Sequence, residues 1–235
     1  MSFAYCAGCS HSQLHRILAE VLPTLPVSAP PIGVSGTGCS EQMGQYFDIP
    51  FVAAAAGQAP AVAAGLKRSR PERLVFTYQG DGDLAARGLD LLMSTASRQE
   101  SITVICLNNL VMAGSGGQMS PTSLTGQVTT STRLGRSQSR MGAPLKLAET
   151  VAHFPGVGFA QRVAMHTPEA VENTHQALQT AFAFQQEAQG ISFIEVLGWC
   201  PPYWDCSPVA AQQRLEKEVF RHFPLGTFRK ARGRL

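Results

Sequence analysis

The sequence predicts an α/β protein with a mostly parallel sheet and helices on both faces of that sheet. Short runs rich in Val, Ile and Phe alternate with longer segments of helical periodicity, which is typical of βαβ units. These runs are also largely apolar along their length, as expected for strands that helices cover on both sides. Both observations favour one continuous α/β architecture.

The elements follow in order along the chain. Four strands are expected, at Arg73–Tyr78, Ile102–Leu107, Phe159–Met165 and Ile191–Leu197. Five helices are expected, at Ser12–Leu22, Ala59–Arg68, Leu84–Arg98, Pro168–Gln189 and Pro208–His222. The last two begin with Pro after Thr167 and Ser207, which is a favoured pattern at a helix N-terminus.

Length and composition limit the class of protein. The 235 residues suit one domain over 1–235, and 44% hydrophobic against 15% charged residues argues against disorder. Arg229, Lys230, Arg232 and Arg234 leave 15 basic against 16 acidic residues elsewhere (19 − 4 = 15), so no basic face for nucleic acid is predicted. With neither a signal-peptide pattern nor a membrane-spanning run, we expect a cytoplasmic protein that binds no membrane.

A polar segment interrupts the alternation. Met119–Met141 is rich in Ser, Thr, Gly, Gln and Arg and holds almost no large apolar residue. Polar segments of this length are usually functional or face a partner. Arg133, Arg136 and Arg140 within it are expected to face solvent or another subunit, with contact to an anionic substrate as the alternative.

Two strand ends carry the residues of greatest chemical interest. Gln79-Gly80-Asp81-Gly82-Asp83 follows one strand, and Asn108-Asn109 follows the next. In such sheets, sites form at the carboxyl ends of strands. The two glycines let the backbone turn and approach an anion, while the carboxylates imply a bridging cation such as Mg²⁺. The alternative is that both segments are ordinary turns without a function. This alternative is less favoured because both segments follow strands of the same predicted sheet.

These residues resemble a known signature. Gly80-Asp81-Gly82 with Asn108-Asn109 is similar to the GDG…NN motif of thiamine-diphosphate enzymes. The longer sequences of residues 76–85 and 116–122 resemble the β subunit of 2-oxoacid:ferredoxin oxidoreductases, closest to the 2-ketoisovalerate and 2-oxoglutarate types. The resemblance extends from Cys6 to 224–226, and it implies the thiamine-diphosphate-binding fold with a diphosphate-type domain.

The resemblance also implies a set of cofactor residues. Asp81, Asn109 and the Val111 carbonyl would hold Mg²⁺. The remaining positions, which would lie along the diphosphate or beside the thiazolium and pyrimidine, are Gly80, Gly82, Asp83, Gly114, Ser115, Gly38, Cys39 and Ser40.

The six cysteines need a separate explanation. Cys106 lies inside an apolar strand, where a packing role is expected. From residue types alone, the others allow a thioredoxin-like pair at Cys6 and Cys9, a structural zinc site, or a [4Fe–4S] cluster. The resemblance favours the cluster, with ligands Cys6, Cys9, Cys39 and Cys200. Cys206 is the substitute for the fourth ligand.

Some positions depart from the residues that are common in this family. Ala56-Gly57-Gln58 replaces a common His-Gly-Arg, and Met112 replaces a common aromatic residue. These changes lie on the substrate side of the implied site, so the 2-oxoacid is left open. His11 and His15 share one helix face and are expected to pack or cap, with a catalytic base as the alternative.

The function implied by the resemblance is that of a β subunit. The enzyme would oxidatively decarboxylate a 2-oxoacid to acyl-CoA and CO₂ and pass single electrons through the [4Fe–4S] cluster to ferredoxin or a similar acceptor. The activating Glu is expected on an α subunit that carries the pyrimidine domain, with γ and ferredoxin-like δ subunits in the same complex. The alternatives are a subunit of a non-redox thiamine-diphosphate decarboxylase or carboligase, and a non-catalytic structural subunit.

Overall fold

The centre of the protein is a seven-stranded sheet in the order β2-β1-β3-β4-β8-β7-β9. The computed structural model describes residues 4–231. The strands all pair in parallel except β9, which runs antiparallel to β7. Their bounds are β1 Ile32–Ser35, β2 Phe51–Ala53, β3 Val75–Gly80, β4 Thr103–Asn108, β7 Val157–Ala164, β8 Ile191–Leu197 and β9 Gly226–Lys230. The predicted fold class is confirmed.

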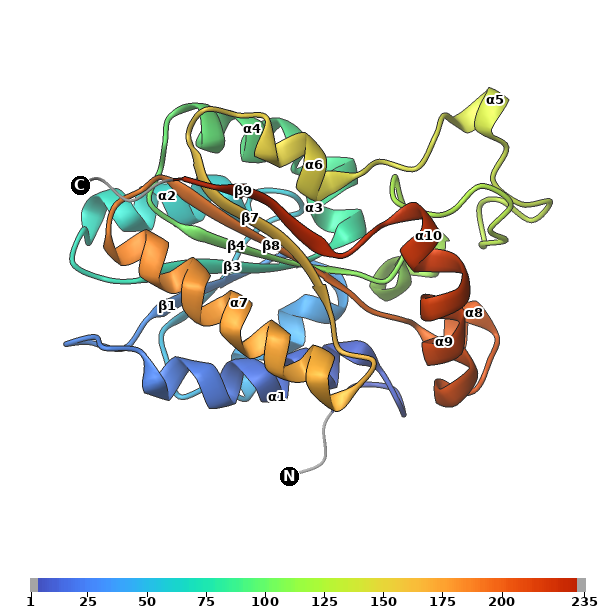
Figure 1. Cartoon of the computed structure of the whole chain (residues 1–235), viewed down its shortest axis with the longest axis horizontal. Coiled ribbons are helices and arrows are strands. Elements are labelled where there is room, and N and C mark those ends of the chain that lie inside the picture. The colour runs from blue at the N-terminus through green and yellow to red at the C-terminus, as the bar shows by residue number, and fades with distance from the viewer. Residues whose placement is uncertain (1–3, 232–235) are drawn as a thin grey trace.

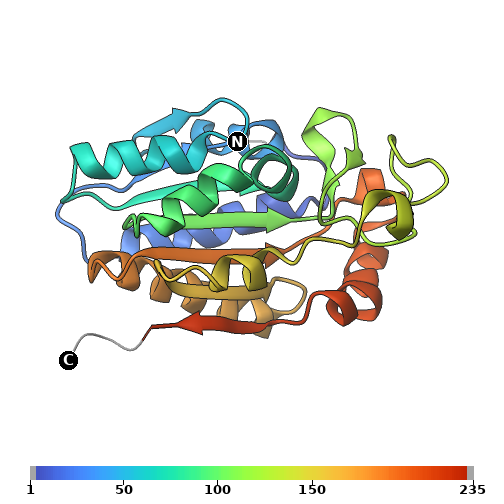
Figure 2. The same ribbon diagram turned by 90° about the horizontal axis from the view of Figure 1, so that it is seen from above.

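Helices cover both faces of this sheet (Figures 1 and 2). On one face lie α1 Ser10–Val21 and α7 Pro168–Gln186, and on the other α2 Ala59–Ser69, α3 Asp81–Arg87, α4 Leu89–Ser97 and α6 Leu147–Ala152. Each face has its own apolar cluster, with Phe76 and Phe182 in the first and Val104 and Phe193 in the second. Burial on both sides explains why the central strands are apolar along their length.

The shorter elements gather at the carboxyl ends of the parallel strands, at the right of Figure 1. They include a two-stranded antiparallel sheet and several short helices. Their bounds are β5 Val111–Met112, β6 Gln118–Met119, α5 Gln138–Met141, α8 Pro201–Trp204, α9 Pro208–Arg214 and α10 Phe220–His222, with the 3-10 turns Gly38–Gln45 and Ala113–Ser115. A further 3-10 turn, Leu22–Thr24, follows α1 near the residues that precede β1 and β2.

Several expected elements differ in detail. The four predicted strands exist, but β1, β2, β5, β6 and β9 were missed; β1 and β2 have only four and three residues. The predicted helix over 84–98 is two helices, broken at Gly88, where an added Cβ would lie 2.6 Å from the Gly57 carbonyl oxygen. The segment 208–222 is interrupted by a π-helical turn at Leu215–Val219.

Two further observations complete the outline. Within residues 4–231, every helix is too short or too polar to cross a bilayer. Of the predicted basic tail, Arg229 and Lys230 belong to β9, whereas Arg232 and Arg234 lie outside the described residues.

Candidate functional site

A cavity of about 300 Å³ opens at the carboxyl ends of β3 and β4. It is lined by His11, by Ala56 and by residues from three longer segments, 37–40, 80–87 and 109–115. They contain every position that the sequence suggested for a cofactor, namely Gly38, Cys39, Ser40, Gly80, Asp81, Gly82, Asp83, Asn109, Val111, Gly114 and Ser115. Residues up to 77 positions apart (115 − 38 = 77) therefore share one hollow at the edge where parallel sheets form their sites.

Gly114 allows close contact between two of the segments that line the cavity. A Cβ at Gly114 would lie 2.6 Å from the backbone nitrogen of Cys39. Backbone atoms cannot swing aside as a flexible side chain can, so a larger residue at 114 would push the two loops apart. The absence of a side chain at Gly114 keeps Cys39 against the 113–115 turn.

Three oxygen-bearing groups converge at the base of the cavity: the Asp81 carboxylate, the Asn109 amide and the Val111 carbonyl, here named the oxygen site. One terminal amide atom of Asn109 lies 3.3 Å from Asp81 Oδ1 and 2.8 Å from the Val111 carbonyl oxygen. As nitrogen, that atom donates to both oxygens; as oxygen, it completes a set of three that suits a cation. Octahedral Mg²⁺ with ligands at about 2.1 Å sets neighbouring oxygens about 3 Å apart, so the residues fit this ion.

Asp81 is a buried carboxylate, and no cationic side chain of residues 4–231 contributes to its pKa. It is 1% exposed, and this burial raises its pKa to about 6, although hydrogen bonds from Ser120 and Thr122 oppose the rise. The Thr122 hydroxyl donates to Asp81 Oδ2. Because a buried charge is unfavourable unless it is compensated, a bound cation would stabilise the ionised form.

A left-handed residue gives the oxygen site its shape. Leu110 is buried and has φ +64°, which is uncommon for a residue other than glycine. Its N–H donates to Asn108 Oδ1 at 3.2 Å, and its carbonyl accepts from Ser123 Oγ at 2.6 Å and Gln127 Nε2 at 2.9 Å. The turn between Asn109 and Val111 is thus held from both sides.

The polar segment is built around one buried guanidinium. Arg136 is 4% exposed, and the prediction that it faces solvent or another subunit was wrong; Arg133 and Arg140 are exposed as expected. In a segment with few apolar side chains, the carbonyls need donors, and the five N–H groups of arginine supply them. Its guanidinium donates to the carbonyls of Ser120, Pro121, Ser123, Met141, Gly142 and Ala143.

Asp83 has a different role from Asp81. Its carboxylate accepts from Thr37 Oγ1 at 2.8 Å, the Gly57 N–H at 2.9 Å and Gln79 Nε2 at 2.6 Å. These bonds join the start of α3 to the end of β3 and to the loops that carry Thr37 and Gly57. The sequence also suggested that 79–83 forms a Gly-rich turn, but residues 81–83 are the first turn of α3, where acidic side chains are favoured by the helix dipole.

Four thiols lie near one another beside the cavity: Cys6, Cys9, Cys39 and Cys200, here named the thiol set. Burial raises the pKa of Cys9 to about 11 and that of Cys200 to about 12, and the charges of Cys39 and Cys6 contribute further to both rises. The four groups are therefore close enough to interact electrostatically. Cys206 instead packs at the edge of an apolar cluster, and Cys106 is buried in β4 as expected.

Hydrogen bonds join the segments that carry these thiols. Ser10 Oγ donates to the Trp199 carbonyl at 2.8 Å, and Trp199 Nε1 donates to the Gly8 carbonyl at 2.8 Å. Trp204 Nε1 donates to the Asn109 carbonyl at 3.0 Å. The CxxC segment is thus fixed against the Cys200 segment, which in turn contacts the oxygen site.

The thiol set can be compared with what a single metal ion requires. In the stretch from 4 to 231, no three His, Cys, Asp or Glu side chains are grouped to hold one metal ion. A four-iron cluster takes one thiolate on each iron, so its ligands stand farther apart than those around one zinc ion. Backbone N–H groups of His11 and Ser12 point to the Cys9 sulfur, and that of Tyr203 points to Cys200, as suits thiolate ligands.

Among the lining residues that were not assigned to the site from the sequence, His11 and Arg87 have ionisable side chains. His11 packs as expected, with Nδ1 2.6 Å from the Tyr78 hydroxyl, and burial lowers its pKa to about 3, but it also borders the cavity. Arg87 is the one cationic side chain among the described lining residues and is exposed. Its place one helical turn after Asp83 was the available signal.

Comparisons with known proteins place the chain in a family. Residues 36–196 match the model of a thiamine pyrophosphate enzyme, C-terminal TPP binding domain. Ketoisovalerate oxidoreductase subunit VorA of Methanothermobacter thermautotrophicus is 36% identical over 96% of this chain and 47% of the relative. 2-Oxoglutarate synthase subunit KorB of Methanothermobacter marburgensis is 31% identical over 85% of this chain and 66% of the relative. The chain thus spans about half the length of the ketoisovalerate relative.

A solved structure shares the fold. The 2-oxoglutarate:ferredoxin oxidoreductase from Magnetococcus marinus, with 2-oxoglutarate, coenzyme A and succinyl-CoA bound, superimposes with a TM-score of 0.78 at 19% identity. The match covers 100% of this chain and 83% of the other. At this identity the likeness concerns the fold alone.

Proposed function

Because the chain belongs to the family of thiamine pyrophosphate enzymes, we propose that it is the β subunit of a thiamine-dependent 2-oxoacid:ferredoxin oxidoreductase. The enzyme would oxidatively decarboxylate a 2-oxoacid to acyl-CoA and CO₂. The observation that carries the proposal is the contact between the Gly114 turn and Cys39, because it joins the cofactor cavity to the thiol set. A non-redox decarboxylase or a purely structural subunit has no need of that contact.

The oxygen site would hold Mg²⁺ through Asp81, Asn109 and the Val111 carbonyl. Around it, the backbone of Gly80, Gly82 and Asp83, together with Gly114 and Ser115, would receive the diphosphate, while Gly38, Cys39 and Ser40 would border the rings. When bound, thiamine diphosphate supplies the chemistry of decarboxylation. The protein's part is to orient the cofactor and to exclude water, since the oxygen site is almost wholly buried.

The thiol set would hold a [4Fe–4S] cluster, with Cys6, Cys9, Cys39 and Cys200 as ligands and Cys206 as the substitute. Cys39 belongs both to the cavity lining and to the thiol set. An electron leaving the cavity would therefore have a short path to the cluster. Trp199 and Trp204, which are 2% and 7% exposed, would keep water from it.

The remaining parts of the enzyme would come from other subunits. We propose that 1–235 is a single thiamine-diphosphate-binding domain with cluster ligands near both ends. An α subunit would supply the pyrimidine domain and the activating Glu, with γ and ferredoxin-like δ subunits beside it in the cytoplasm.

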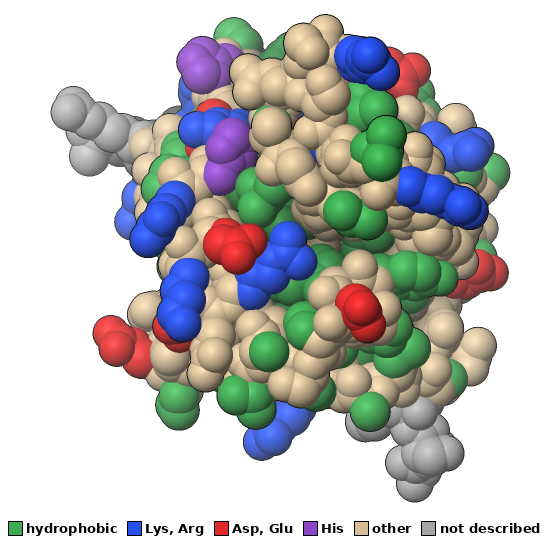
Figure 3. Space-filling model, turned by 90° about the vertical axis from the view of Figure 1, so that its right-hand side faces the viewer, with side chains coloured by type: hydrophobic (Ala, Val, Ile, Leu, Met, Phe, Trp, Pro, Cys, Tyr) green, Lys and Arg blue, Asp and Glu red, His purple; other side chains and the backbone are tan. Residues whose placement is uncertain are grey.

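Hydrophobic side chains lie exposed among polar ones at the carboxyl end of the sheet (Figure 3), and they include Val128, Leu134, Met141, Tyr203 and Val209. Such a surface suits contact with these partners.

Reconstitution tests this proposal. The complex of the full chain with its partner subunits, supplied with thiamine diphosphate, Mg²⁺ and CoA, should reduce ferredoxin or a viologen dye in the presence of a 2-oxoacid. A panel that includes 2-ketoisovalerate and 2-oxoglutarate would identify the substrate. Decarboxylation without dye reduction would favour the non-redox alternative, and the absence of any turnover with a folded, cofactor-loaded complex would favour a structural subunit.

A further inference from the structure

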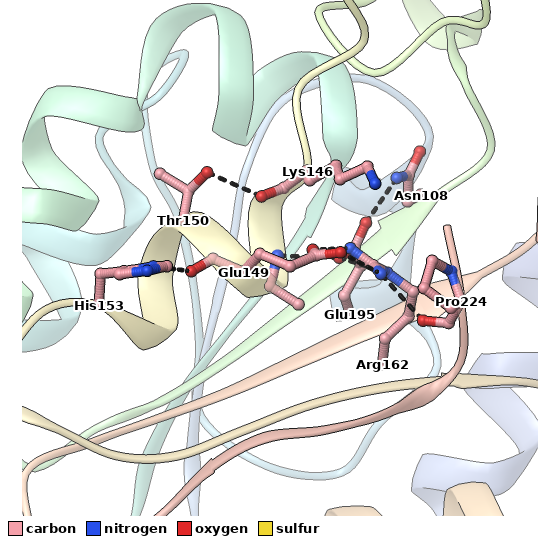
Figure 4. Close-up of polar contacts among 9 residues, drawn as sticks. Asn108, Lys146, Glu149, Thr150, His153, Arg162, Glu195 and Pro224 are labelled. Atoms are coloured by element: carbon pink, nitrogen blue, oxygen red, sulfur yellow. Dashed lines mark hydrogen bonds and ion pairs between the residues drawn. The ribbon is translucent and has the colours of Figure 1, made fainter. Parts of the chain in front are cut away.

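Figure 4 shows a group of charged side chains, Arg162, Glu195 and Glu149, with Asn108 bonded to it. The Arg162 and Glu195 side chains are both 0% exposed, and Glu149 completes the group from α6. Arg162 Nε donates to Glu195 Oε2 at 3.0 Å, and its NH1 donates to Glu149 Oε1 at 3.0 Å. One guanidinium is thus shared by two carboxylates.

Sheet register explains how these groups meet. Glu195 on β8 is paired with Arg162 on β7 and with Cys106 on β4, so their side chains point to the same face. Asn108 lies two residues beyond Cys106 on that face. Its Nδ2 donates to Glu195 Oε1 at 2.6 Å, while Glu195 Oε2 accepts from the backbone N–H of Ala148 at 3.0 Å.

Asn108 extends this group to the oxygen site. Its Nδ2 is bound to Glu195, and its Oδ1 accepts the N–H of the left-handed residue Leu110. Both groups of one amide are therefore used, which fixes the orientation of the amide. Leu110 lies between Asn109 and Val111, two of the three members of the oxygen site.

A purely stabilising role does not account for this arrangement. Apolar residues of similar volume often stabilise a core as well as a buried ion pair does. A negative charge on Glu195, by contrast, selects the amide orientation that leaves Asn108 Oδ1 free to accept from Leu110. Charge at this position therefore determines a detail of the turn that an apolar pair cannot.

We propose that Glu195 is a positioning residue for the cation site and acts through Asn108. With its charge balanced by Arg162, the carboxylate orients the Asn108 amide, which holds the left-handed turn and so presents Asn109 and the Val111 carbonyl to the ion. The inference rests on the proposed function, because the ion is the Mg²⁺ of that site. Supporting partners of this kind typically change metal affinity by about 10–100-fold when they are removed.

The chain offers a matched pair of variants. Glu195→Gln and Glu149→Gln each remove one negative charge from Arg162, but only Glu195 contacts Asn108. A glutamine has one carbonyl oxygen in place of two, so Glu195→Gln loses either the Asn108 contact or the contact to Arg162 and Ala148. The affinity for Mn²⁺ would be measured by electron paramagnetic resonance on the full chain in its complex, with thiamine diphosphate present, and the melting temperature on the same samples.

We expect Glu195→Gln to weaken Mn²⁺ binding by about tenfold or more, and Glu149→Gln to change it by less than that while lowering the melting temperature. Asn108→Ala provides a second variant if Glu195→Gln does not fold, because it breaks the link and keeps the Glu195–Arg162 pair. It should also weaken Mn²⁺ binding by about tenfold or more. Equal effects of the two glutamine variants, or an unchanged affinity in Asn108→Ala, would overturn the inference. Failure of the wild-type complex to bind Mn²⁺ with thiamine diphosphate would instead contradict the proposed function.

Discussion

The oxygen site and the thiol set lie beside the same cavity, but the chain builds them in different ways. Asp81 and Asn109 directly follow the adjacent strands β3 and β4, and Val111 begins β5. Asp81 and Asn109 are held by hydrogen bonds from buried neighbours. The thiol set brings together three segments of the chain, the CxxC of Cys6 and Cys9, the loop of Cys39 and the segment of Cys200, and its Cys6 is exposed. The first site is completed by the fold itself, whereas the second depends on what binds it.

The pKa values of the two regions also differ in a way that affects what each can bind. Burial raises the pKa of Asp81 to about 6, so its carboxyl remains mostly ionised at neutral pH. Burial raises the pKa of Cys9 to about 11, so this thiol is protonated at neutral pH until a metal displaces its proton. We therefore expect damage at the oxygen site to abolish cofactor binding, and damage at the thiol set to remove iron while the cavity survives.

The largest expected effect concerns Asp81. Asp81→Ala removes the only carboxylate of the oxygen site, and thiamine diphosphate binding in the presence of Mg²⁺ should fall below detection by calorimetry. Asp90→Ala is the control, because Asp90 is an exposed acidic residue on the neighbouring helix α4. Normal cofactor affinity in Asp81→Ala would remove this residue from the site.

The second prediction concerns Cys39, which belongs to the thiol set and also lines the cavity. Cys39→Ser should lose most of the iron, because one cluster ligand is missing, yet bind thiamine diphosphate within about tenfold of the wild type. Iron analysis and calorimetry on anaerobically purified protein measure the two quantities. Cys206→Ser should keep its iron; if it loses the iron and Cys200→Ser does not, Cys206 is the fourth ligand.

A smaller effect is expected from the polar segment that supports the oxygen site. Arg136→Gln leaves several buried carbonyls without a donor, which should lower the free energy of unfolding by about 2–3 kcal/mol. Exposed Arg140→Gln should change it by no more than about 0.5 kcal/mol. Denaturant unfolding compares the two, and a similar small change in both would show that Arg136 is not the centre of this segment.

The smallest effect is expected at Arg87. Because it is the cation on the cavity lining and is exposed, Arg87→Ala should raise the KM for the 2-oxoacid a few-fold, about 1 kcal/mol of binding, and leave the melting temperature unchanged. Arg70→Ala, an exposed substitution away from the cavity, is the control. An unchanged KM would assign recognition of the substrate carboxylate to other groups.

The parts of the fold that could be predicted from the sequence are those that a local residue pattern determines. The central strands β3, β4, β7 and β8 have six to eight residues and long apolar runs, which makes them recognisable. Strands β1 and β2 are too short to show such a pattern, and they form because β3 and its neighbours provide an edge to pair with. The break at Gly88 was missed because it depends on the close approach of Gly57.

The site shows the same contrast between local and long-range signals. Most of the cavity lining could be predicted, because these residues follow strand ends in short motifs. The roles of Arg136 and Glu195 could not be predicted, because they depend on hydrogen-bond partners that are 5–16 and 33–87 positions away in the sequence. A buried charge in an otherwise apolar strand, such as Glu195 within Ile191–Leu197, was the one signal that the sequence offered.

The most direct test of a cofactor cavity beside a redox cluster is a spectroscopic one. Electron paramagnetic resonance of the anaerobically purified, dithionite-reduced full chain, with iron analysis on the same sample, measures the cluster independently of the substrate. We predict a [4Fe–4S]⁺ signal with about four irons per chain, and its loss in Cys39→Ser. A protein without a signal that holds one zinc ion per chain would contradict the assignment of the thiol set and, with it, the electron-transfer role.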